Sequence, residues 1–309
     1  MALDTTRIAP SVDVERMGRA HVAVIGIGGA ANLVASLVRS GLGAITLIDP
    51  DTVSEQNLVR QEFERLDVGK SKVNALAYRL KQITLDVDIT SVAADVTALP
   101  EAECDRVFGP ADLILATTDR FAAQSWANRA ALKHRIPAVW PGVYAGGLGG
   151  EVVFWRPGLP CYRCLMSGRY RAQEQARREG RSADPASDGT TVFETGLIDA
   201  IAGQLVIGLL TDGAENRLGR LVQSLGDRNF LHVKLDSNYV LNGRDVIREQ
   251  LGIPEDNDRF FAWSVAARRD PDGGHPPCPD CIAFGHAVIT LQESNERSFP
   301  SSLPRTSRT

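Results

Sequence analysis

A strand, a glycine turn, a helix and a second strand follow one another within residues 21–49, and this unit constrains the fold more than any other stretch. Apolar strands are expected at residues 22–25 and 44–48. The turn holds three glycines: Gly26, Gly28 and Gly29. Glycines let a backbone approach phosphates, and the amides at a helix start favour an anion. The second strand ends in Asp49, about 20 residues after Gly28, where an acid accepts from ribose hydroxyls.

The end of the glycine turn departs from the dinucleotide pattern. Ala30 or Ala31 stands where a last glycine is expected. This departure weakens the case for a dinucleotide and leaves a nucleotide site in general intact. An NAD-dependent dehydrogenase would fit this unit, but it would not explain the polar and cysteine motifs that come later in the chain.

Apolar strands and amphipathic helices continue to alternate after this unit. Further strands are expected at residues 87–92, 111–116 and 138–140. The alternation predicts an α/β fold, a Rossmann-like, doubly wound and mostly parallel sheet with helices on both faces. A glycine-rich segment with a strand at residues 151–155 predicts an antiparallel extension. The polar segment 167–191 is expected to be a loop.

A polar cluster follows Asp49. Its members are Asp51, Asn57, Arg60, Gln61, Lys70 and Lys72. Arginine makes bidentate contacts to phosphate, and lysine supplies a point charge. Any one of these residues alone is typical of a solvated loop. Together, with Asp49 before them, they favour a clamp for the triphosphate of ATP.

Asp119 follows the buried strand 111–116 and should meet Asp49 at the same edge of the sheet. Magnesium prefers one or two carboxylates together with phosphate oxygens, so Asp119 is the candidate magnesium ligand. The alternative is that Thr118 or Asp119 caps the helix that starts at Arg120. Both roles are compatible.

Two CxxC pairs, more than a hundred residues apart, contain four of the five cysteines. They are Cys161 with Cys164 and Cys278 with Cys281. Each pair can present two thiolates to one tetrahedral zinc, which would staple the C-terminal segment onto the central domain. A redox pair and buried thiols are the alternatives. The fifth cysteine, Cys104, is typical of a small, half-buried residue.

The overall composition excludes several classes of protein. The 309 residues carry a net charge of −4, which gives no electrostatic footprint for nucleic acid. No uninterrupted apolar run reaches the length of a membrane span, and the first residues lack the apolar core of a signal peptide. A cytoplasmic protein is the expectation.

The ordered set of motifs resembles the ThiF/MoeB/HesA adenylyltransferases, which are similar to ubiquitin-activating enzymes. The motifs are VIGIGG, LIDPDTVSEQNLVRQ, VGKSKV, ATTD and the two CxxC pairs. The resemblance implies a homodimer that binds ATP. It also implies adenylation of the C-terminal glycine carboxylate of a small ubiquitin-like or sulfur-carrier protein, with release of pyrophosphate.

The resemblance also implies a role for each matching residue. Asp49 would hold the ribose, with Asp51 and Asn57 supporting the site. Arg60 and Lys72 would neutralise the phosphates, with Gln61 nearby, and Asp119 would hold magnesium. The backbone near Asp95 and Val96 would contact adenine, and Arg7 is the best match to an arginine that reaches across the dimer.

Members of the family that form a thioester carry a cysteine in the loop before the helix at residues 193–210, and residues 167–194 hold none. We therefore expect adenylation without a thioester on this chain. Adenylation of a peptide or a tRNA, and a nucleotide-binding scaffold without activity, are the alternatives.

The expected domains are an adenylation domain at 1–235, a zinc-tied segment at 236–290 and a disordered tail at 291–309.

Overall fold

The computed structural model describes residues 3–184, 189–236, 240, 243–252, 264–268 and 277–286. The expected disordered tail at 291–309 lies outside the described residues, so its state stays a prediction. Only parts of the expected segment 236–290 are described.

The described strands form one eight-stranded sheet in the order β3-β2-β1-β4-β5-β6-β7-β8. The strands are β1 (His21–Ile25), β2 (Ala44–Ile48), β3 (Asp88–Val92), β4 (Leu113–Ala116), β5 (Ala138–Val143), β6 (Gly149–Trp155), β7 (Phe230–Lys234) and β8 (Ser264–Arg268). The pairs from β3 through β5 are parallel, and those from β5 through β8 are antiparallel. The sequence-based fold, a mostly parallel doubly wound sheet with an antiparallel extension, is confirmed.

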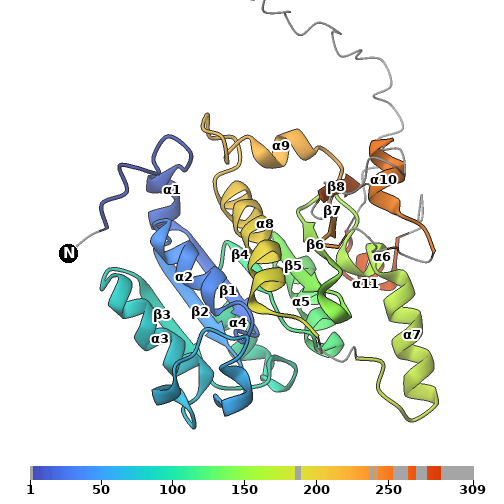
Figure 1. The fold of residues 1–309 in the computed structure, drawn as a ribbon, viewed down its shortest axis with the longest axis horizontal. Helices are drawn as coiled ribbons and strands as arrows, with labels where there is room; N and C mark the ends of the chain where they lie inside the picture. Colours follow the sequence, from blue (N-terminus) through green and yellow to red (C-terminus); the bar gives the residue numbers. More distant parts are fainter. Residues whose placement is uncertain are drawn as a thin grey trace, which may run out of the picture.

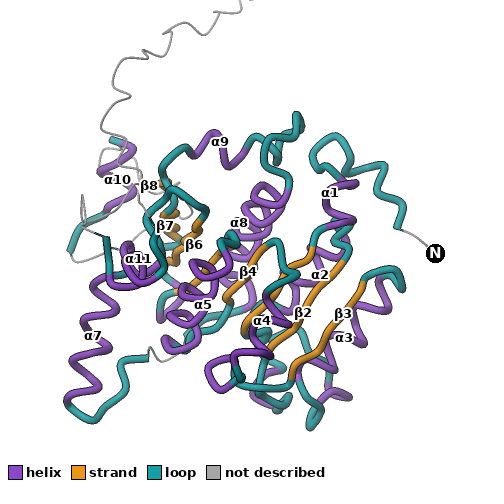
Figure 2. Tube along the Cα trace, turned by 180° about the vertical axis from the view of Figure 1, so that it is seen from behind, coloured by secondary structure: helices purple, strands orange, loops and turns teal. Residues whose placement is uncertain are grey.

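The described helices lie on both sides of the sheet and around its antiparallel end (Figure 1). They are α1 (Val14–Arg19), α2 (Ala31–Arg39), α3 (Lys72–Ile83), α4 (Glu101–Phe108), α5 (Phe121–His134), α6 (Tyr162–Leu165), α7 (Ser167–Arg178), α8 (Val192–Leu210), α9 (Leu221–Leu225), α10 (Val246–Leu251) and α11 (Pro279–Ala283). Four short 3-10 turns join them: η1 (Glu55–Asn57), η2 (Arg65–Asp67), η3 (Val96–Ala98) and η4 (Ala145–Gly147). In Figure 1, α2 and α8 lie in front of the sheet, and Figure 2 brings α4 and α5, on the opposite face, to the front.

The strand order reverses between β1 and β4. The chain moves outward from β1 through β2 to β3, then returns to the other side of β1 as β4. In open α/β sheets the crevice for ligands lies at the carboxyl ends of the strands beside such a reversal. The fold therefore places the glycine turn after β1, Asp49 after β2 and Asp119 after β4 around one crevice.

The expected loop at 167–191 is wrong in its first half, because α7 occupies Ser167–Arg178. The segment is rich in arginine, glutamate and glutamine, which are strong helix formers. The Glu174 carboxylate also pairs with Arg177 at 3.0 Å and with Arg178 at 3.0 Å, one turn further along. Residues 169–178 are highly polar and contain no proline or glycine, which was a sign of an exposed helix.

The alanines that end the glycine turn are buried, and α8 packs closely on α2 beside them. Ala30 and Ala31 are buried, 2% and 0% exposed. On the facing side of α8, a Cβ at Gly203 would lie 3.1 Å from a methyl of Leu33. The close approach of the two helices therefore favours glycine at position 203. Ala30 also lines the cavity described below, and a larger residue there would need space in a close-packed region.

The helix α8 is long and apolar enough to cross a membrane by length and composition. Its residues nevertheless contact α2 and the parallel strands β4 and β5. Ala202, Leu205 and Val206 are almost fully buried in that contact. The apolar composition of α8 therefore reflects its place in the core of the fold.

Candidate nucleotide site

A cavity of about 420 Å³ lies at the carboxyl ends of β1, β2, β4 and β5. The predicted nucleotide-binding residues all line it: Gly26, Gly28, Gly29, Asp49, Asp51, Asn57, Arg60, Gln61, Lys72, Val96 and Asp119. These residues follow four different strands, so the fold brings together side chains that are up to about a hundred residues apart in the sequence.

The Asp49 carboxylate holds the glycine turn against β2. One oxygen accepts from the backbone N–H of Ile27 at 2.8 Å, and the other accepts from that of Asp51 at 2.9 Å. Burial raises the pKa of Asp49, while these two N–H donors lower it. Asp49 therefore shapes the turn in addition to the ribose contact expected of it.

Lys72 brings a buried cation to the cavity from the first residue of α3. Its side chain is 7% exposed, and its Nζ lies 2.8 Å from a carboxylate oxygen of Asp51, which is 62% exposed. A buried ammonium whose one carboxylate partner faces solvent keeps N–H donors available for an anionic ligand. Arg60 lines the same cavity, so the two predicted phosphate-neutralising side chains share one wall.

Asn57 holds the loop that follows β2, and Gln61 lies against the glycine turn. The Asn57 amide oxygen accepts from the backbone N–H of Ser54 at 2.8 Å and caps η1. The Gln61 amide lies over the glycine turn, where a Cβ at Gly28 would come within 2.8 Å of it. The buried Oε1 of Gln61 has no hydrogen-bond partner within the described part of the chain. A nucleotide hydroxyl would supply the missing donor.

Asp119 is exposed at the end of β4 and does not cap α5. The Thr118 hydroxyl instead accepts from the Arg120 N–H at 3.2 Å, and Asp184 accepts from the Phe121 N–H at 3.2 Å. The N-cap of α5 is Arg120, whose side chain makes no capping hydrogen bond, so the expectation that Thr118 or Asp119 caps the helix is wrong. The Asp119 carboxylate is left facing the cavity, as a magnesium ligand would need.

Val96 and Asp95 form the wall where adenine was expected. Val96 is 3% exposed, and the Asp95 carboxylate pairs with Arg120 at 2.9 Å. An apolar side chain at the wall of a cavity suits a planar base.

Several cavity residues come from the chain after β4 and were not predicted. They are Gln124, Arg169, Thr195, Ile198 and Asp199. Arg169 donates to the Tyr162 hydroxyl at 2.9 Å and lies 3.7 Å from the buried Glu151 carboxylate. Arg169 lies on α7, which the sequence suggested was a loop. Asp199 is an acid in the middle of the apolar helix α8, and this position was the signal that could have identified it.

Arg7 does not line the cavity of its own chain; it lies exposed in the N-terminal turn before α1. Its expected reach across a dimer therefore stays a prediction.

Cys104 lies on α4 with 8% exposure, as expected of a small packed residue, and burial raises its pKa.

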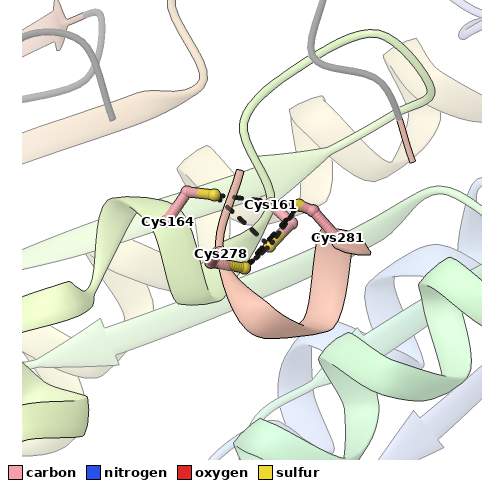
Figure 3. Close-up of side chains that lie close together, drawn as sticks. All are labelled: Cys161, Cys164, Cys278 and Cys281. Atoms are coloured by element: carbon pink, nitrogen blue, oxygen red, sulfur yellow. Dashed lines mark hydrogen bonds between the residues drawn. The ribbon is translucent and has the colours of Figure 1, made fainter. Parts of the chain in front are cut away.

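The four remaining cysteines gather in one cluster where α11 meets α6 (Figure 3). All four Sγ atoms lie within 4.8 Å of one another, and the contacts measure 3.5 to 3.8 Å. Four sulfurs at about 2.3 Å from a tetrahedral zinc would be about 3.8 Å apart, so the spacing fits that ion. With four thiolates the coordination would be closed, which is typical of a structural site.

Hydrogen bonds connect this cluster to the cavity. Tyr162 lies between Cys161 and Cys164, and its backbone N–H donates to Asn128 at 3.0 Å. Its hydroxyl binds the Gln124 amide at 2.9 Å, and Gln124 in turn donates to the carbonyl of Thr118 at 2.6 Å. The cysteine cluster and the end of β4 are therefore connected by two hydrogen bonds, through the side chains of Tyr162 and Gln124.

Comparison with protein-family models gives a match to the ThiF family over residues 4–241. Among curated proteins, ubiquitin-like modifier-activating enzyme 5 of Drosophila melanogaster is 31% identical over 194 residues, covering 58% of this chain and 48% of that protein. The protein of the same name from Bombyx mori is 32% identical over 162 residues, covering 48% of this chain and 41% of that protein. The chain thus spans about half the length of the curated relatives it matches.

Solved structures with a similar fold include E. coli MccB with ATP. That match has a TM-score of 0.54 and 20% identity, and it covers 72% of this chain and 62% of that one. A structure of MccB with N-formylated MccA matches with a TM-score of 0.60 at 17% identity, over 87% of this chain and 69% of that one. PaaA matches with a TM-score of 0.57 at 19% identity, over 75% of each chain. At these identities the likeness concerns the fold.

Proposed function

The chain belongs to the ThiF family, and from this premise we propose that it adenylates a carboxylate with ATP. The favoured substrate is the C-terminal glycine of a small ubiquitin-like or sulfur-carrier protein. The observation that carries the proposal is the joining of Arg60, Lys72 and Asp119 around the glycine turn in one cavity. A dehydrogenase needs none of these three residues, whereas a triphosphate site needs all of them.

The proposed reaction joins two anions. A carboxylate oxygen of the substrate attacks the α-phosphorus of ATP, and the bond from that phosphorus to the bridging oxygen breaks, which releases pyrophosphate. Positive charge and positioning therefore matter more than a general base. Arg60 and Lys72 would offset the repulsion, and Asp49 would fix the ribose. Magnesium held by Asp119 would supply further positive charge to the phosphates when bound.

An exchange assay between ATP and labelled pyrophosphate tests this function, with candidate carrier proteins as substrates. We expect carrier-dependent exchange by the unmodified chain. The Asp119→Ala variant should lose about 100-fold or more, because the ligand of the phosphate-bound magnesium is gone. Asp105→Asn, a surface change on α4, is the matched control and should keep full exchange. Undiminished exchange by Asp119→Ala would refute the magnesium role.

We also expect no carrier thioester on this chain. Four cysteines are committed to the cluster, and Cys104 is buried on α4 outside the residues that line the cavity. Intact-mass measurement after incubation with ATP and carrier should find the adenylate of the carrier and no adduct on the protein that dithiothreitol removes. A reducible adduct that maps to a cysteine would overturn the prediction.

A peptide substrate is the second candidate. It is favoured by the fold likeness to MccB, whose structures include one with N-formylated MccA. Short synthetic peptides in the same exchange assay separate it from a carrier protein, because only one class should stimulate exchange.

A homodimer in the cytoplasm, with Arg7 reaching the partner's site, completes the proposal. We also propose the adenylation domain at 1–235 and the zinc-tied segment at 236–290.

A further inference from the structure

Asp199 is a buried carboxyl group that the proposed adenylation chemistry does not use. It lies in the middle of α8, is 8% exposed, and lines the nucleotide cavity. No hydrogen bond to its side chain is found among the described residues. The other acids of the cavity differ: Asp49, Asp51 and Asp95 are bonded, and Asp119 is exposed. An unpartnered buried acid needs a ligand or a proton.

The packing of α8 places Asp199 over the glycine turn. Thr195, Asp199 and Gly203 are four residues apart and so share one face of the helix. Thr195 faces Gly29, since its methyl lies 3.7 Å from where a Cβ at Gly29 would be, and Gly203 faces Leu33. Asp199 therefore lies between these contacts, toward the start of α2. That is the place where the turn and the helix amides favour nucleotide phosphates.

The charged groups around Asp199 do not neutralise it. Glu62 acts on its pKa and is already paired with Arg79 at 2.6 Å. The cavity cations Lys72 and Arg169 are paired with Asp51 and Glu151. The strands β4 and β5 carry no charged residue, α2 carries only Arg39 at its far end, and α9 carries none. On β6 the Glu151 carboxylate is held by Tyr144 and Arg169, and on α8 itself Glu194 caps Thr191. Burial first, and Glu62 second, raise the pKa of Asp199 to about 7.

We propose that Asp199 binds nucleotide in its protonated form and donates its O–H to a phosphate oxygen, so that ATP binding takes up a proton. This inference rests on the proposed ATP site. A phosphate beside an ionised Asp199 would be repelled, whereas the neutral acid offers a donor. A divalent cation is the less favoured occupant. Apart from the four cysteines, no described group of three or more metal-ligating side chains is close enough to share an ion.

The test is calorimetric titration of the full chain with ATP in magnesium-free buffer, between about pH 7 and about pH 8.5. In this range the terminal phosphate of ATP, with a pKa of about 6, stays ionised. ATP affinity should fall on the order of tenfold as unliganded Asp199 loses its proton. Buffers of different ionisation enthalpy should report an uptake approaching one proton at the upper pH.

Three variants separate donation from mere loss of charge. Asp199→Asn keeps a donor, so its ATP affinity should match the pH 7 value of the unmodified chain and be independent of pH. Asp199→Ala should also be independent of pH but bind about fivefold to tenfold more weakly, because the donor is gone. Glu62→Gln is the control: it should keep the pH dependence, shifted to lower pH.

Each contrary result has a separate meaning. ATP binding that is independent of pH in the unmodified chain would overturn the proposal and leave the proposed function standing. Equal affinity of the Asn and Ala variants would overturn the donor role. A gain in affinity from magnesium that disappears in Asp199→Asn would make Asp199 a metal ligand and also overturn it. Absence of ATP binding at any pH would overturn the proposed function together with this inference.

Discussion

Replacing Lys72 with methionine should reduce carrier-dependent exchange between ATP and pyrophosphate by about 100-fold to 1000-fold. The ammonium is held in place at the first residue of α3, 7% exposed, beside the glycine turn. In the proposed reaction two anions meet, and a fixed cation in a largely buried site stabilises their joining more than a solvated one. Methionine keeps the aliphatic stem and removes the charge, so the loss reports electrostatics rather than packing.

The same change should leave the free energy of unfolding nearly unaltered. Lys72 pairs with Asp51, and since that carboxylate is 62% exposed, water can replace the lost partner. Removal of a buried charge also removes its desolvation cost. Urea titration should therefore show a midpoint close to that of the unmodified chain, in contrast to the large loss of exchange.

Lys70→Met is the matched control for Lys72. Lys70 lies two residues earlier, is 54% exposed and pairs with Asp67 on the surface. It does not line the cavity, so exchange should stay within about twofold, as for an ordinary surface substitution. Equal losses in both variants would mean that net charge, not the position of Lys72, supports the reaction.

The half of the site that follows the first two strands could be predicted from the sequence. Gly28, Asp49, Arg60 and Lys72 lie in one continuous stretch, and the topology of a βαβ unit places strand ends at one edge. Residues close in sequence near a strand end are also close in space. Each of these predicted residues lines the cavity because the local unit alone determines where it lies.

The other half depends on how distant helices pack. Arg169 lines the cavity because α7 directly follows α6, which carries two cysteines of the cluster. Asp199 lines it because one face of α8 packs on α2. The apolar composition of α8 is typical of a buried helix, but it does not say which neighbour Asp199 faces. Tertiary packing decides that direction, and no local pattern encodes it.

Replacing Cys281 with serine should cost several kcal/mol of unfolding free energy and abolish stoichiometric zinc, because a structural zinc site contributes its binding energy to folding. Cys281 is 0% exposed and lies on α11, which the cluster ties to α6. Zinc content by mass spectrometry and urea unfolding of the same samples measure the two effects. Cys104→Ser, another buried cysteine outside the cluster, should keep about one zinc per chain.

Loss of the zinc site should not detach α11 completely. The Asp280 carboxylate accepts from the Asn128 amide at 2.9 Å and from Arg163 at 2.7 Å, so a polar anchor remains beside the cluster. The expected unfolding change is therefore smaller than the full zinc-binding energy, which in small zinc peptides is about 10–16 kcal/mol. Adding Asp280→Asn to Cys281→Ser should lower stability further, because both attachments of α11 are then weakened.

The cluster should also influence the nucleotide site. Tyr162, between two of the cysteines, binds Gln124, and Gln124 donates to the Thr118 carbonyl at the end of β4. A displaced Tyr162 would free Gln124 and loosen the strand end that carries Asp119. We therefore expect Cys281→Ser to weaken ATP binding several-fold at temperatures where it remains folded, on the scale of one lost hydrogen bond. Tyr162→Phe should reproduce the weaker ATP binding with zinc retained. If Tyr162→Phe binds ATP normally while Cys281→Ser does not, the influence travels by another route than this side chain.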